Sequence, residues 1–171
     1  MLRFEEISRE GDDLQLFREL ISEYQQFLGV DLCFQKFDQE LENPLGKYTP
    51  PRGIVLLAYW DGVICACGAL QDLGDGVCEI KRIYVRPEFR RKGIARSISE
   101  YLLGRAKEIG YTTAKLDTLR RLEGAVPLYQ SLGFKETAPY NYNPEADIVY
   151  MERSLMSPLK RKHIPEKETG S

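Results

Sequence analysis

Apolar residues recur along the chain with two periods, one typical of strands and one typical of helices. Alternating or continuous apolar stretches predict strands, which cover residues 2–7, 54–60, 63–70, 79–85, 113–118, 134–137 and 147–152. Apolar positions spaced three and four residues apart predict helices at residues 14–28, 34–41, 94–109 and 126–132. Asp12 is a candidate cap for the first long helix, and Gly29 and Gly110 are candidate stops. The order predicts an α/β (α+β) domain.

Turn residues separate the central strands. Asp61 and Gly62 stand between two apolar stretches, which is the strongest short hairpin signal in the chain, and residues 74–76 (Gly-Asp-Gly) predict a second turn. We therefore expect three antiparallel strands in succession between residues 54 and 85. The preceding segment, from Asn43 to residue 53, is interrupted by glycine and proline and is predicted to be a loop.

The strand at residues 79–85 changes phase along its length. Apolar side chains fall on one face before Lys81 and on the other face after Arg82. A β-bulge near Lys81 and Arg82 would produce this shift, and bulges redirect side chains beside binding sites.

Composition limits the class of protein. The chain has 171 residues, 43% of them hydrophobic, which suits one domain at residues 1–155 followed by a flexible polar tail at residues 156–171. Because neither a membrane-spanning apolar run nor a signal pattern is seen, we expect a cytoplasmic protein without a membrane partner.

Cysteine and histidine usage argues against several catalytic classes. The four cysteines (Cys33, Cys65, Cys67 and Cys78) have no CxxC spacing, and the single histidine, His163, lies in the tail. This pattern gives little support to a disulfide framework, a metal site or a histidine-dependent hydrolase. No metal cofactor is expected.

A basic turn lies where a predicted strand passes into a predicted helix. It carries Arg90, Arg91, Lys92 and Gly93, and the start of a helix offers free amides and a positive dipole end to an anion. Neither G-x-x-x-x-G-K-[ST] nor G-x-G-x-x-G is present, whereas the cation density suits a ligand with several phosphates. The alternatives are a solvated helix start and a nucleic-acid patch.

These residues resemble the GNAT superfamily of acyl-coenzyme A dependent N-acyltransferases. The signature [RQ]-x-x-G-x-[GA] is matched by Arg90, Gly93 and Ala95, and residues 79–87 and 125–134 (A-x-x-x-Y-x-x-x-G-F) are also similar to the family. The resemblance covers residues 2–155. It implies a mixed, mostly antiparallel central sheet of six to seven strands with about four flanking helices, splayed between the strands at 79–85 and 113–118.

The resemblance also implies the co-substrate, acetyl-CoA, and where it binds. Its pantetheine arm would lie in the splay against unpaired backbone groups of Ile83 and Val85, with Tyr84 between them. Its phosphates would lie against the basic turn, whose implied cofactor-binding residues are Arg90, Arg91, Lys92, Gly93, Ile94, Ala95 and Arg96.

Two side chains match catalytic positions of the family. Glu79 would accept the proton of the acceptor amine, directly or through water, and Tyr129 would protonate or orient the leaving thiolate. Transfer would occur by direct attack in a ternary complex, with a backbone amide near Val85 facing the developing oxyanion. The alternative for Glu79 is an ion pair with Lys81 or Arg82, and for Tyr129 an ordinary core position.

The acceptor is less constrained. A small molecule, amino acid or peptide with a free amine fits the aromatic and amide side chains of two variable loops, residues 31–51 and 139–144; the candidates are Phe34, Gln35, Tyr140 and Tyr142. No extended basic groove suggests nucleic acid. The oligomeric state stays open between a monomer and a homodimer. A catalytically silent acyl-CoA-binding regulatory module is the alternative to an N-acetyltransferase.

Overall fold

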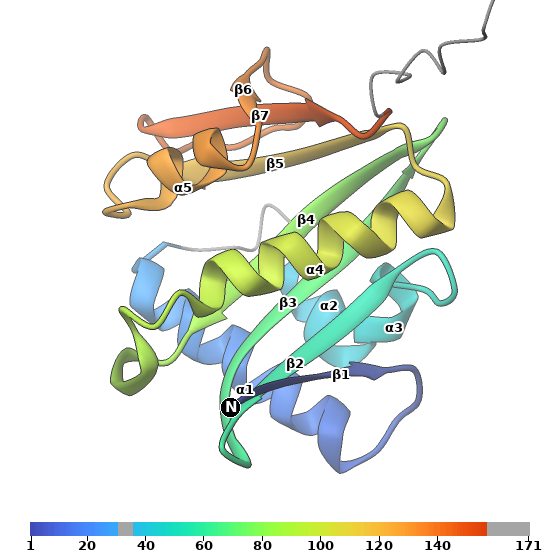
Figure 1. The fold of residues 1–171 in the computed structure, drawn as a ribbon, viewed down its shortest axis with the longest axis vertical. Coiled ribbons are helices and arrows are strands. Elements are labelled where there is room, and N and C mark those ends of the chain that lie inside the picture. The colour runs from blue at the N-terminus through green and yellow to red at the C-terminus, as the bar shows by residue number, and fades with distance from the viewer. Residues whose placement is uncertain (31–35, 157–171) are drawn as a thin grey trace, which may run out of the picture.

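One mixed sheet of seven strands runs through the computed structural model, which describes residues 1–30 and 36–156 (Figure 1). The strand order is β1-β2-β3-β4-β5-β7-β6, and every neighbouring pair is antiparallel except β4 and β5. The strands are β1 (Leu2–Ile7), β2 (Ile54–Trp60), β3 (Val63–Gly74), β4 (Val77–Val85), β5 (Thr113–Leu119), β6 (Lys135–Glu136) and β7 (Ile148–Ser154). The predicted fold class is confirmed.

Helices cover both faces of the sheet. They are α1 (Asp12–Leu28), α2 (Phe37–Glu42), α3 (Pro44–Lys47), α4 (Ile94–Ile109) and α5 (Ala125–Ser131), so the described part has one more helix than expected. In Figure 1, α4 crosses one face of β3 and β4, and α1 lies on the other. None of the described helices is long and apolar enough to span a bilayer.

The two long helices follow the predicted periodicity. Helix α1 buries Leu14, Phe17, Leu20 and Ile21, and α4 buries Ile98, Leu102 and Ala106 at the same spacing. Each ends at a left-handed glycine, Gly29 or Gly110, as predicted. The cap prediction was wrong: Gly11 precedes α1 and Asp12 lies inside the first turn, where its charge still complements the helix dipole.

The hairpin prediction is confirmed, whereas the loop before it holds an unpredicted helix. Asp61 and Gly62 have φ values of 48° and 80°, which is the left-handed pair that a two-residue hairpin needs. Asn43 and Pro44 end α2, as predicted, but they also begin α3, because the Asn43 side chain accepts a hydrogen bond from the Gly46 amide (3.2 Å). Helix α2 begins at Phe37, and the predicted residues 34 and 35 lie outside the described residues.

The predicted bulge in β4 is confirmed. Cys67 pairs with Tyr84 and Ala69 pairs with Lys81, so Gly68 alone faces two residues of β4. One of these, Arg82, has φ of 58°, and its side chain is buried. The bulge therefore turns a charged side chain into the interior.

The sheet opens between its two parallel strands. β4 and β5 pair at Val77–Thr113, Cys78–Ala114 and Glu79–Lys115, and no further pairs follow in the described structure. Figure 1 shows the two strands diverging beyond this point, with β5, β7 and β6 forming the smaller part of the sheet. The sheet therefore splays between β4 and β5, the two strands between which the opening was predicted.

Candidate active site

The turn before α4 presents a run of free backbone amides. Within residues 1–30 and 36–156, the amides of residues 91–96 have no hydrogen-bond acceptor. Arg91 and Gly93 are left-handed (φ of 65° and 72°), and a Cβ built on Gly93 meets nothing within 4 Å. Successive amides in such a turn form an anion-binding concavity, here at the positive end of a long helix. The geometry fits a diphosphate.

The basic side chains around this turn are held apart from one another. Arg90 lies over the Phe27 ring (4.4 Å) and donates from Nε to the Val85 carbonyl (3.3 Å). Lys92 lies 5.0 Å from the Trp60 ring centroid, and Arg96 forms an ion pair with Glu100 (3.2 Å). Arg91 is exposed. Cations at four points around the amides suit a ligand with phosphates at more than one position.

Arg86, four residues before the basic turn, points away from it. Its guanidinium donates to both oxygens of Glu23 on α1 (3.0 and 3.1 Å). This pair fixes α1 against the end of β4 rather than adding charge to the turn.

The opening between β4 and β5 exposes the backbone groups that were expected there. The Arg86 amide donates to the Cys65 carbonyl of β3 (2.8 Å), so strand alternation turns the amides of Ile83 and Val85 toward β5. On the β5 side of β4, no strand pairs with these residues in the described structure. The Tyr84 side chain lies on the α1 side, 5.7 Å from the Tyr24 ring centroid.

Tyr129 of α5 has a position that is compatible with both interpretations, a core residue and a proton donor. It is buried, and its ring packs edge-on against Phe134 at 5.9 Å. Its hydroxyl, however, has no hydrogen-bond partner among the described residues. Burial raises the pKa of this phenol, and the Tyr24 phenol adds to the effect, so Tyr129 stays a proton donor at neutral pH.

Glu79 lies where the sheet begins to open. Its side chain is 4% exposed; Oε2 accepts a hydrogen bond from the Tyr140 hydroxyl (2.6 Å), and Oε1 lies 3.6 Å from the Lys81 ammonium. The ion pair with Lys81 that competed with a catalytic role is therefore formed, together with a bond to a predicted acceptor-site residue. Burial and the neighbouring Glu79 carboxylate raise the pKa of Tyr140 far above its usual value, which keeps its hydroxyl protonated.

Arg82 pairs with a different carboxylate, Glu40, which is 42 positions away in the chain and could not be predicted from a local pattern. Its Nε and Nη2 donate to Glu40 of α2 at 2.8 and 2.7 Å, and Tyr48 and Lys47 donate to the same carboxylate, each at 3.0 Å. Burial opposes ionisation of Glu40, but Arg82 and Lys47 together lower its pKa to about 2. The only sequence signal was an arginine at a predicted bulge.

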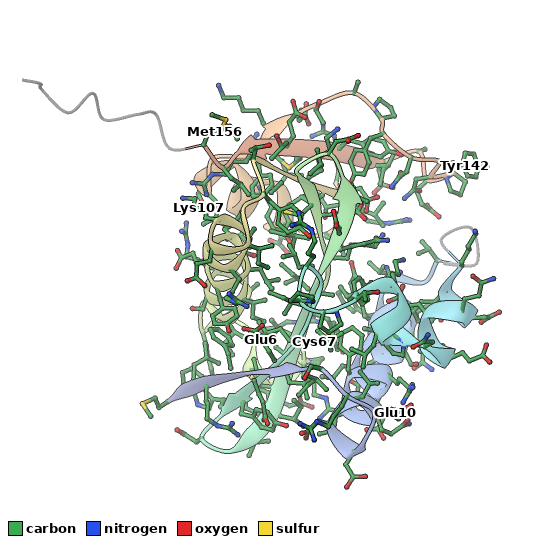
Figure 2. All side chains as sticks on the ribbon, turned by 90° about the vertical axis from the view of Figure 1, so that its right-hand side faces the viewer. Glu6, Glu10, Cys67, Lys107, Tyr142 and Met156 are labelled. Carbon is green, nitrogen blue, oxygen red and sulfur yellow. The ribbon has the colours of Figure 1, made fainter. Side chains whose placement is uncertain are left out.

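A cleft of about 1010 Å³ adjoins Glu79 on the side away from the basic turn. Tyr140 and Tyr142 line it, as do α2, α3 and the β3–β4 turn, whereas Phe34 and Gln35 lie outside the described residues. Four lysines face it from separate segments, a feature that sequence analysis missed: Lys36, Lys47, Lys81 and Lys115. Tyr142 is 74% exposed and projects from one side of the molecule (Figure 2).

The described residues contain neither an exposed cysteine nor a cluster of metal-binding side chains. Cys65, Cys67 and Cys78 are buried, and burial raises their thiol pKa values. The described residues contain no group of three His, Cys, Asp or Glu side chains that could hold a metal ion. Cys33 and His163 lie outside them.

Comparison with known proteins points to one family. Residues 14–134 match the model of the acetyltransferase (GNAT) family. An uncharacterised N-acetyltransferase of Schizosaccharomyces pombe is 45% identical over 145 residues, which cover 84% of this chain and 89% of that protein.

Solved structures share the fold. A GNAT-family acetyltransferase from Staphylococcus aureus superposes with a TM-score of 0.74 at 20% identity, covering 91% of this chain and 99% of that one. The PaiA N-acetyltransferase of Thermoplasma acidophilum, solved in complex with coenzyme A, gives a TM-score of 0.70 at 18% identity, covering 90% and 99%.

Proposed function

The chain belongs to the acetyltransferase (GNAT) family, and on this premise we propose that it transfers an acetyl group from acetyl-CoA to the free amine of a small molecule, amino acid or peptide. The observation that carries the proposal is the run of unbonded amides at residues 91–96, which leads into the opening between β4 and β5 and on to Glu79. An anion site, a channel with unpaired backbone groups and a buried carboxylate thus follow one another along β4.

The residues of the basic turn and of β4 fit the proposed co-substrate. The amides of residues 91–96 would hold its diphosphate, with Arg90, Arg91, Lys92 and Arg96 around it. The amides of Ile83 and Val85, which face the opening, would bind the amide groups of its pantetheine arm. When bound there, acetyl-CoA supplies an acetyl group activated as a thioester.

Glu79 and Tyr129 supply the two proton transfers that acyl transfer requires. An alkylammonium has a pKa near 10, so Glu79 accepts its proton, directly or through water, before the nitrogen attacks the thioester carbon. The N–C bond forms as the C–S bond breaks, and the Tyr129 hydroxyl donates a proton to the departing sulfur. The Val85 amide faces the opening, where it can donate to the carbonyl oxygen as negative charge grows.

A catalytically silent acyl-CoA-binding module is the competing proposal. Such a module would need the amides of residues 91–96 but not a buried carboxylate beside a cleft of about 1010 Å³. The placement of Glu79 and its bond from Tyr140 therefore favour the enzyme.

Thiol release from acetyl-CoA across a panel of amines tests the proposal. We expect thiol release with at least one class of amine, a loss of roughly 10²–10⁴-fold in kcat for Glu79→Gln, and a smaller loss for Tyr129→Phe. Both variants should bind coenzyme A with the Kd of the unaltered protein. Coenzyme A binding without thiol release for any amine would favour the silent module, and no binding at millimolar coenzyme A would overturn both.

A further inference from the structure

Around Glu40 and Glu79, at one end of the cleft, three cations face two carboxylates. Lys47 of α3 and Lys81 of β4 line the cleft there, and Arg82 of β4 pairs with Glu40 from outside the lining. Arg82 balances the negative charge of Glu40 and donates two hydrogen bonds of 2.8 and 2.7 Å to its carboxylate. The contact of Lys47 with Glu40 (3.0 Å) therefore shares a carboxylate whose charge is already balanced.

The pKa of Lys47 reflects its burial and this surplus of positive charge. Burial and the neighbouring Lys81 ammonium lower its pKa to about 8, even though Glu40 acts in the opposite direction. An additional negative charge placed at this end of the cleft would offset both effects. This end of the cleft is thus complementary to an anion.

The second carboxylate, Glu79, lies beside Lys81 as a loose ion pair. Their closest atoms are 3.6 Å apart, compared with 2.7 Å for Arg82 and Glu40. An α-amino acid carries the opposite arrangement, an ammonium and a carboxylate separated by about 3 Å through the N–Cα–C unit. Laid against the pair, its ammonium would meet Glu79 and its carboxylate would meet the lysines, so each charge of the ligand faces an opposite charge.

We propose that the acceptor is an α-amino acid with a free carboxylate, which Lys47 and Lys81 bind while Glu79 receives the amine. This assignment rests on the proposed acetyl transfer and narrows its acceptor, because an amine or a peptide N-terminus lacks the adjacent carboxylate. Glu79 takes the ammonium proton, the N–C bond forms and the C–S bond breaks, so the products are the N-acetylamino acid and the thiol.

Paired substrates test the assignment. A panel of α-amino acids is assayed for thiol release, each beside its carboxamide, which keeps the amine and the side chain but removes the negative charge. A charge-assisted hydrogen bond contributes about 1.5–3 kcal/mol, which corresponds to roughly 10–100-fold, so we expect kcat/KM for the best amino acid to exceed that of its amide by this factor. Equal values for the acid and the amide would overturn the assignment.

Lysine variants locate the effect in the cleft. Lys47→Met should raise KM for the amino acid by roughly 10-fold or more and leave the KM of the amide unchanged, since Arg82 still holds Glu40. Lys107→Met, in the last turn of α4 on the other side of the molecule from Tyr142, is the matched control and should change neither (Figure 2). An equal effect of Lys47→Met on the acid and the amide would contradict carboxylate binding.

A binding measurement separates failure of this assignment from failure of the proposed function. N-acetylphenylalanine and its amide are titrated into the protein by calorimetry in the presence of coenzyme A, because the aromatic and apolar lining (Tyr140, Tyr142 and Leu73) suits that side chain. Preference for the acid, lost in Lys47→Met, supports the carboxylate site even if no amine gives thiol release. Binding of neither or of both equally, while other amines are acetylated, overturns the assignment alone.

Discussion

The buried pair of Glu40 and Arg82 makes a strong prediction about stability. Glu40→Gln keeps the size of the side chain but removes the charge that Arg82 and Lys47 face. Both side chains of the pair are almost fully buried, at 0% and 4% exposure, so the guanidinium would be left buried without its counter-charge. Breaking a buried pair in this way costs about 3–5 kcal/mol.

The pKa of Glu40 gives an independent magnitude. Lowering it from the usual value of 4.5 to about 2 corresponds to about 3 kcal/mol of stability at neutral pH, at about 1.4 kcal/mol for each pH unit. Because the folded pKa is depressed, this stabilisation is present above the unfolded pKa and is lost as the pH falls toward 2. By pH 3.5 about 1 kcal/mol should already be lost.

Urea unfolding at pH 7 and pH 3.5 measures both quantities. Glu40→Gln should unfold with a free energy about 3–5 kcal/mol below that of the unaltered protein at pH 7, and this difference should narrow by about 1 kcal/mol at pH 3.5. Glu42→Gln, an exposed change in the same helix, should stay within about 0.5 kcal/mol at both values. A gap below about 1 kcal/mol, or one that does not change with pH, would refute the reasoning.

Four further predictions concern the site and the core. Gly93→Ala forces a left-handed φ of 72° on alanine, at about 1–2 kcal/mol, and should raise the calorimetric Kd for coenzyme A; an unchanged Kd would contradict the amide site. Gly68→Ala places a Cβ 2.8 Å from the Ile98 side chain of α4 and should lower the free energy of unfolding by about 1–3 kcal/mol, whereas Gly104→Ala, in α4 with nothing within 4 Å, should not lower it. Tyr140→Phe removes the 2.6 Å bond to Glu79 and should lower kcat by roughly 10-fold in the thiol-release assay, with no change in the Kd of coenzyme A. The Kd of N-acetylphenylalanine should rise between pH 7 and pH 9, as Lys47 loses its proton near pH 8 while the facing Glu40 and Arg82 keep their charges, and Lys47→Met should give a flat profile.

Most of the fold could be predicted because its signals are local. The hairpin at Asp61 and Gly62, the glycine stops of α1 and α4, and the bulge at Arg82 each depend on a few neighbouring residues. Helix α3 was missed because the Asn-Pro pair that ends one helix also starts the next. The error at Asp12 was one of position only, since Gly11 takes the cap.

The candidate site also has a part that local sequence signals predict and a part that they do not. The basic turn is one continuous motif, so its residues could be named from the sequence, although the pairing of Arg86 with Glu23 could not. The cleft is assembled from α2, α3, β4, β5 and the loop that carries Tyr140, which are distant in the chain. The pair of Glu40 and Arg82 spans 42 positions, and no local pattern encodes such a contact.

Only three residue pairs between β4 and β5 join the two parts of the sheet in the described structure. We call these two parts, β1-β2-β3-β4 and β5-β7-β6, blocks, and the three pairs the seam. Elsewhere in the sheet, backbone hydrogen bonds connect neighbouring strands. Beyond the seam, the two blocks are held together by the packing of side chains from α4 and α5. A molecule lodged in the gap would supply the missing cross-links, and part of its binding free energy would appear as cooperativity between the blocks. Amide hydrogen exchange in β5 and β7 would then slow when the gap is saturated with that molecule. The bound molecule would thus stabilise the sheet by connecting its two parts.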